Sequence, residues 1–172
     1  SESLAGLIEG SELCAGSGDV AWSAWGSCGA ALALTFLGRP ADAVALLDEA
    51  DAAASTLRSR RLALDAAARR CICEYQLGRW GDAHRTIERG RRLAQGFTSV
   101  SVTACFDAVD AWLATARGHA DVAAATMDQA FALVGALGDP PAWTPLLHWA
   151  GVHAAILAGD PAAVAPHGQA LA

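Results

Sequence analysis

A glycine-centred turn recurs along the chain with a period of about 40 residues, and this repeat constrains the fold more than any other feature. The turn glycines lie 40, 40 and 41 residues apart, at Gly38, Gly78, Gly118 and Gly159. An apolar residue followed by an acidic one keeps the same period downstream, at Leu47-Asp48, Ile87-Glu88 and Met127-Asp128. A period of this length is typical of proteins built from stacked supersecondary units, in which each unit contacts its neighbours.

Each unit is expected to be a hairpin of two helices. The chain holds 42 alanines among its 172 residues, and alanine is the best helix former. The first helix of each hairpin is expected at residues 22–37, 62–77, 102–117 and 143–158, where glycine then closes it. The second helix begins with Pro40, Trp80, His119 or Pro161 and runs to about Thr56, Ala94 and Leu137. Proline suits the first turn of a helix. The linkers between hairpins are expected at residues 57–61, 96–101 and 138–142.

Both ends of the chain fall part-way through this pattern. Residues 4–15 match a second helix without its first, and residues 160–172 end inside another second helix. We therefore expect one helical-repeat domain over residues 1–172, cut from a longer multidomain protein.

These observations predict an all-α fold of about four stacked hairpins with a concave and a convex face. Small residues follow each turn glycine at fixed spacing, at Ala43, Ala83 and Ala123 and again at Ala50, Gly90 and Ala130. Small residues at such positions let neighbouring helices pack closely, so the hairpins are expected to stack into one continuous solenoid.

Composition excludes several classes of function. The formal net charge is −6, and all 12 basic residues are arginines, because the chain has no lysine. An acidic chain is a poor duplex-DNA or membrane-surface binder. Two uncharged stretches, 20–38 and 140–159, approach the length of a membrane span but are expected to be buried helices. The five cysteines form no disulfide framework, which favours a cytoplasmic protein, and the usage of Ala, Arg and Gly favours an actinobacterial source.

No motif for enzyme chemistry stands out. A phosphate-binding loop ending in Gly-Lys-Ser/Thr requires lysine and is therefore impossible here. His148 and His153 are five residues apart, whereas paired metal ligands on one helix face are three or four apart. We expect no metal, no cofactor and no catalytic residues.

The order of small residues and turn glycines resembles the tetratricopeptide family, and the resemblance covers nearly the whole chain. The matching residues of the first unit are Ala31, Gly38, Ala43 and Ala50. The resemblance implies a right-handed solenoid. The period of 40 exceeds the usual 34 of that family. Longer units with an Ala136-Leu137-Gly138-Asp139 ending are similar to the helical-repeat regions of large bacterial LuxR-type and maltose-activator-like ATP-dependent transcriptional regulators. This similarity implies a sensor segment of such a regulator.

The same resemblance implies a ligand-binding groove, because in such arrays the first helices line the concave face. Carried over by register, the candidate groove residues are Trp25, Asp65, Tyr75, Asp107, Trp112, Trp149 and His153. A mostly apolar concavity with a few polar groups is typical of a small-molecule or peptide site. The alternative is that the three tryptophans pack between adjacent hairpins.

Arg70 and Asp110 occupy the same repeat position in neighbouring units, where the family normally has a large apolar residue. They are expected to form a partly buried ion pair between repeats. The alternative is that both point into the groove, with Asp107 as a third polar group there. The basic run at residues 85–92 is expected to be a solvated helix face, and nucleic-acid contact is its alternative.

The sequence therefore predicts a non-catalytic binding and sensor module that takes a small-molecule inducer or a partner peptide in its groove. One alternative is a protein–protein interaction scaffold that forms a homodimer through its convex face or an exposed end. Another is an enzyme with a site in the groove that uses His148 or His153.

Overall fold

The computed structural model describes residues 2–96, 100–136 and 144–170, which form nine α-helices and no strand. The expected all-α class is therefore confirmed for this part of the chain. The helices are α1 (Glu2–Gly16), α2 (Val20–Phe36), α3 (Pro40–Thr56), α4 (Arg60–Gln76), α5 (Trp80–Ala94), α6 (Val100–Ala116), α7 (Ala120–Gly135), α8 (Thr144–Ala158) and α9 (Pro161–Ala170).

The helices fall into two compact units, Ser1–Leu93 and Ala94–Ala172. The first unit holds α1 to α5, and the second holds α6 to α9. Each unit is a stack of helical hairpins in its own right. The expectation that residues 1–172 form one domain stays a prediction.

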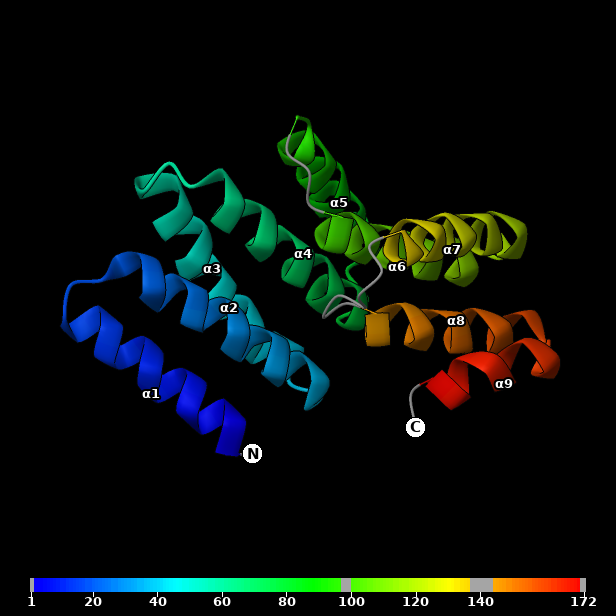
Figure 1. Ribbon diagram of the computed structural model, residues 1–172, viewed down its shortest axis with the longest axis horizontal. Coiled ribbons are helices and arrows are strands. Elements are labelled where there is room, and N and C mark those ends of the chain that lie inside the picture. Colours follow the sequence, from blue (N-terminus) through cyan, green and yellow to red (C-terminus); the bar gives the residue numbers. More distant parts are fainter. Residues whose placement is uncertain (1, 97–99, 137–143, 171–172) are drawn as a thin grey trace. The chain divides into compact units, whose positions relative to one another are not determined.

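In the first unit, consecutive helices pack side by side: α1 on α2, α2 on α3, and α3 on α4 (Figure 1). The first helices of neighbouring hairpins, α2 and α4, also contact each other. This is the packing expected of stacked hairpins. Its core is built largely from small side chains around Cys28, Leu47 and Leu62, which are buried.

The second unit repeats this arrangement. Helix α6 packs on α7 and α8, α7 packs on α8, and α8 packs on α9 (Figure 1). The interior contains larger side chains than that of the first unit: Phe106, Trp112, Leu113 and Leu147 are all fully buried.

The glycine turns are as the sequence predicts. Gly38, Gly78, Gly118 and Gly159 all have positive φ, between 70° and 82°. After α2, the Arg39 amide donates to the Leu34 carbonyl at 2.9 Å, which satisfies a carbonyl at the helix end. A Cβ at any of the four would have open space, so glycine is required there for backbone conformation and not for room.

The predicted starts of the first helices were wrong by two residues. Helices α2, α4 and α6 begin at Val20, Arg60 and Val100, so the linkers before α4 and α6 are shorter than expected. The reason is capping: the Asp19 carboxylate accepts a hydrogen bond from the Trp22 amide, and the Ser59 hydroxyl accepts one from the Leu62 amide. The expected linker at residues 138–142 lies outside the described residues.

The small residues after the turns are packing positions, as expected. Ala43, Ala83 and Ala123 are fully buried, and Ala50, Gly90 and Ala130 are buried on the same helix face, about two turns further on. The uncharged helix α2 likewise buries Ala24, Cys28 and Ala31. In the part of the chain that the structure describes, no helix has the length and apolar character needed to cross a membrane.

Candidate functional site

The candidate groove residues of the first unit each contact different neighbours within that unit. The Trp25 ring is half-buried on α2, and the Arg61 guanidinium carbon lies 5.9 Å from its centroid, a cation–π distance. A hollow of about 450 Å³ is lined by only four residues here, Trp22, Trp25, Ser59 and Arg61. With Trp22 largely exposed, this is a surface depression at the α2–α4 junction.

Asp65 and Tyr75, both on α4, each have a neighbour within the first unit. The Asp65 carboxylate forms an ion pair with Arg69, one helical turn further along. The Tyr75 ring stacks on Trp80 with centroids 6.4 Å apart. Burial raises the pKa of the Tyr75 hydroxyl.

The candidate residues of the second unit are brought together on α6 and α8. Trp112 is 1% exposed and meets Trp149 edge-on, with centroids 4.7 Å apart. The centroids of the Trp149 and His153 rings are 5.8 Å apart. Asp107 is half-buried on α6, five residues before Trp112. Trp112 thus packs between the two hairpins, which was the alternative to a position in the groove. A groove that joins the residues of both units stays a prediction.

Arg70 forms ion pairs within the first unit. Its guanidinium lies 2.7 Å from an Asp48 carboxylate oxygen and 3.3 Å from an Asp51 oxygen, and Arg89 also reaches Asp51 at 3.1 Å. Asp110, its expected partner, is half-buried on α6 of the second unit. The pair between Arg70 and Asp110 stays a prediction, and the Asp48 and Asp51 contacts are ones that the repeat register did not suggest.

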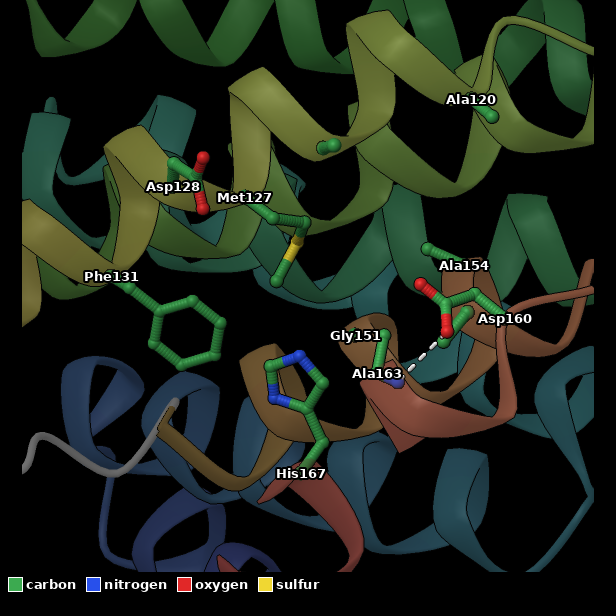
Figure 2. A pocket seen from close by; sticks show the side chains of 11 residues that line it. Ala120, Met127, Asp128, Phe131, Gly151, Ala154, Asp160, Ala163 and His167 are labelled. Atoms are coloured by element: carbon green, nitrogen blue, oxygen red, sulfur yellow. Dashed lines mark hydrogen bonds between the residues drawn. The ribbon is translucent and has the colours of Figure 1, made fainter. Parts of the chain in front are cut away.

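One pocket lies entirely within the second unit, between α7, α8 and α9. Its volume is about 260 Å³. Helix α7 contributes Ala120, Ala124, Met127, Asp128 and Phe131. Helix α8 contributes Gly151, Ala154 and Ala155, and the third side consists of Asp160, Ala163 and His167. Figure 2 shows Met127 and Phe131 facing the His167 ring across the pocket, with Asp160 at its far end.

At one wall of this pocket, the imidazole rings of two histidines contact each other. The Nδ1 atoms of His148 and His167 are 3.3 Å apart, and the Phe131 ring lies 4.9 Å from the first ring and 5.4 Å from the second. Burial, and then the nearby His167, lowers the pKa of His148. His148 is therefore neutral at physiological pH.

Gly151 leaves room for the His167 ring in this wall of the pocket. A Cβ at this position would lie 2.5 Å from the His167 ring, so any larger residue would displace that ring. Glycine inside a helix otherwise destabilises it by about 1 kcal/mol relative to alanine. A glycine in the middle of the helix expected at 143–158 is therefore the sequence signal for the close approach of another side chain to this helix.

Asp160 has a structural role beside its place in the pocket. Its Oδ1 accepts hydrogen bonds from the backbone amides of Ala162 and Ala163, at 3.0 and 3.2 Å, and so caps the N-terminus of α9. Met127, Phe131, Asp160 and His167 were all missed as site residues, because no motif links them and three helices are needed to bring them together.

A second polar cluster lies in the first unit. The buried Glu74 carboxylate on α4 accepts a hydrogen bond of 2.7 Å from the Thr86 hydroxyl on α5. Burial raises the pKa of Glu74, and the Thr86 hydrogen bond and the nearby Arg70 oppose that rise. This contact joins the two helices of one hairpin.

The thiols are structural in character. Burial raises the pKa of the Cys28 thiol to about 11, and it also raises the pKa of Cys73. Such thiols stay protonated and are weak nucleophiles. Within the described ranges, no three His, Cys, Asp or Glu side chains are grouped so that they could hold a metal ion.

In comparisons with known proteins, no family model, no curated protein and no solved structure matches the chain. Any assignment of function therefore depends on the residues and geometry described above.

Proposed function

We propose that the chain is a non-catalytic binding module that captures a small molecule in the pocket between α7, α8 and α9. The observation that supports it is the pocket itself: three helices surround about 260 Å³, mostly with apolar side chains, and Asp128, Asp160 and His167 add a few polar groups. That combination is typical of small-molecule sites, and the volume lies just below the roughly 300–1,000 Å³ of pockets for drug-sized ligands.

The size of the pocket limits its occupant. An apolar protein cavity of about 150 Å³ accommodates benzene. A pocket of about 260 Å³ therefore fits a molecule with one ring and a short polar arm. A longer peptide would have to lie outside it.

The chemistry of the pocket favours binding over catalysis. None of the residues that line it in the described part of the chain is a Ser, Thr, Cys, Tyr or Lys. Nucleophilic catalysis most often uses one of these types; a carboxylate or a histidine can also serve, and His167 is stacked on Phe131. Asp160 already serves as a helix cap, which favours a fixed role over a reacting one.

We further propose that this module belongs to a cytoplasmic bacterial transcriptional regulator and senses its inducer. The support is the resemblance of the repeats to LuxR-type and maltose-activator-like regulators. In such a protein, a ligand held between α7 and α9 would favour the arrangement of hairpins that binds it best. It would shift the regulator only by its difference in affinity for the two states.

Ligand-observed NMR with a library of one-ring compounds tests the proposal. Ala124 and the neighbouring Ala125 are both exposed on α7, but only Ala124 lines the pocket. We expect Ala124→Leu to fill the pocket and abolish the binding seen with the unaltered chain, and Ala125→Leu to leave it unchanged. Equal binding to both variants, or no binding to the unaltered chain, would overturn the proposal.

A second candidate function is a protein-interaction scaffold, which exposed apolar residues near the N-terminus favour. Leu13 on α1 and Trp22 on α2 are 69% and 67% exposed, and Val20 at the start of α2 is also exposed. Exposed apolar patches mark interaction surfaces. Analytical ultracentrifugation tests this function: a dimer that Leu13→Glu dissociates would support it, and a monomer at all concentrations would exclude self-association through this patch.

A further inference from the structure

We propose that the ligand of this pocket is an organic cation, a primary ammonium group carried on one apolar ring. The inference rests on the proposed small-molecule function and adds the charge and chemical class of the ligand. Three features of the second unit support it: the nature of the pocket's charged groups, the state of its imidazole pair, and the net charge of the unit around it.

All the formally charged side chains that line the pocket are carboxylates. Asp128 lies on α7 beside Met127, and Asp160 lies across the pocket at the start of α9 (Figure 2). No arginine lines this pocket in the described residues. An ammonium group is the ligand charge that two carboxylates select, because charge-assisted hydrogen bonds are stronger than neutral ones.

One carboxylate oxygen of Asp160 is not used by the helix cap. The two amide hydrogen bonds that cap α9 both go to Oδ1, so Oδ2 has no part in the cap. A carboxylate accepts hydrogen bonds on both oxygens. Asp160 can therefore hold an ammonium group while it keeps the helix end capped.

The same cap disfavours an anionic ligand. Helix N-termini bind anions through their free amides, but the first amides of α9 are already satisfied by the Asp160 carboxylate. A ligand carboxylate would displace that cap and lie next to two aspartates.

The imidazole pair offers no fixed positive charge to an anion. A hydrogen bond between the Nδ1 atoms of His148 and His167 needs one nitrogen as donor and the other as acceptor, so at least one ring is neutral. The burial that disfavours the charged form of His148 acts in the same direction. Phe131 also lines the pocket, and the face of a phenyl ring attracts cations.

The second unit as a whole is strongly acidic. Residues 94–172 contain six aspartates, no glutamate and a single arginine, Arg117, which gives a formal charge of −5 with histidines neutral. The first unit, by contrast, carries nearly balanced charges. A negative field around a small pocket raises the local concentration of cations and lowers that of anions.

Affinities of three nearly isosteric probes test the proposal. The probes are 2-phenylethylammonium, 2-phenylethanol and phenylacetate, titrated into the full chain at neutral pH and followed by NMR. We expect the ammonium compound to bind at least about tenfold more tightly than the alcohol, and phenylacetate to bind most weakly. Added salt should weaken binding of the ammonium compound and leave the alcohol unaffected.

Two variants test which carboxylates cause the preference for the ammonium compound over the alcohol. Asp160→Asn keeps a good helix cap, because asparagine caps helices as well as aspartate does. We expect Asp160→Asn and Asp128→Asn each to remove most of the tenfold preference while the alcohol binds as before. Asp121→Asn, on the exposed first turn of α7 and not among the residues that line the pocket, is the matched control for net charge and should keep the preference.

The outcomes separate the two proposals. If the alcohol or phenylacetate binds as tightly as the ammonium compound, the inference of a cationic ligand is overturned and the small-molecule function stands. The inference is also overturned if Asp121→Asn lowers the preference as much as Asp160→Asn does. If none of the probes binds and the one-ring library also gives no binder, the small-molecule function fails and the inference fails with it.

Discussion

The imidazole rings of His148 and His167 meet in the second unit with their Nδ1 atoms 3.3 Å apart, and this contact joins α8 to α9. Helix α9 has no buried residue, so the half-buried His167 ring, stacked against Phe131, is its main aromatic anchor. The wall of the pocket therefore depends on a contact between imidazole rings that come from two different helices.

Acid should weaken the second unit. The pKa of His148 is lower in the folded chain than in the unfolded one, so the unfolded state binds more protons in the range below the ordinary histidine value. The stabilisation is present above that value and is lost as the pH falls through the folded pKa. We expect the free energy of unfolding to decrease from about pH 7.5 to about pH 5. Denaturant titrations of His148→Gln should show less of this decrease, and those of the exposed control His119→Gln should show all of it.

Loss of the Thr86 hydroxyl should destabilise the first unit. Thr86→Val leaves the buried Glu74 carboxylate without its 2.7 Å donor, which lowers the free energy of unfolding by about 1–3 kcal/mol. The exposed Thr56→Val is the control, with an expected effect within about 0.5 kcal/mol. Equal effects of the two substitutions, measured by denaturant unfolding, would show that the Glu74 contact does not stabilise the hairpin.

Glu74 should also give the opposite pH dependence to His148. Its pKa is raised in the folded chain, so the folded state binds more protons than the unfolded state at pH values just above the ordinary glutamate value. The stabilisation from this group is present below the unfolded pKa and is lost as the pH rises through the folded pKa. We expect Glu74→Gln to remove this component, which a comparison of unfolding free energies across the acid range measures.

Glycine at position 58 should stabilise the chain. Arg58 has a φ of 49° in the turn after α3, a left-handed conformation that glycine occupies without strain. We expect Arg58→Gly to raise the free energy of unfolding by about 0.5–1 kcal/mol. Arg58→Ala removes the same side chain but keeps the unfavourable φ, so a similar gain from alanine would contradict this explanation.

Trp112 should be a stability residue. It is 1% exposed against Trp149, so Trp112→Ala is expected to lower the free energy of unfolding by about 3–5 kcal/mol. Trp22→Ala, at a largely exposed position, should change it by at most about 0.5 kcal/mol. Thermal unfolding of both variants measures the difference, and a small effect at Trp112 would refute the packing role.

The hairpins could be predicted from sequence because their signals are local. A turn glycine such as Gly38 fixes the end of a helix through one residue's φ, and Pro40 fixes the start of the next. The starts of α2 and α4 lie two residues before the predicted ones because Asp19 and Ser59 cap these helices. Here the pattern was present, and its interpretation was incomplete.

The pocket could not be predicted in the same way, because its residues come from three helices and follow no common period. Phe131 and His167 lie on different hairpins, and their contact depends on how α9 docks against α7 and α8. The register that suggested Trp112 as a groove residue gives its position along α6, but it does not determine whether a neighbouring helix covers the ring. Burial of that kind is a property of the packed unit and not of the motif.

Chemical-shift mapping on the isotope-labelled full chain tests the central claim most directly. The account predicts that 2-phenylethylammonium shifts backbone amides around Met127, Gly151 and His167, on α7, α8 and α9, and that Ala124→Leu suppresses these shifts. Shifts centred instead on the Trp25 hollow of the first unit, or no shifts with any one-ring compound, would contradict the assignment of this pocket as the ligand site.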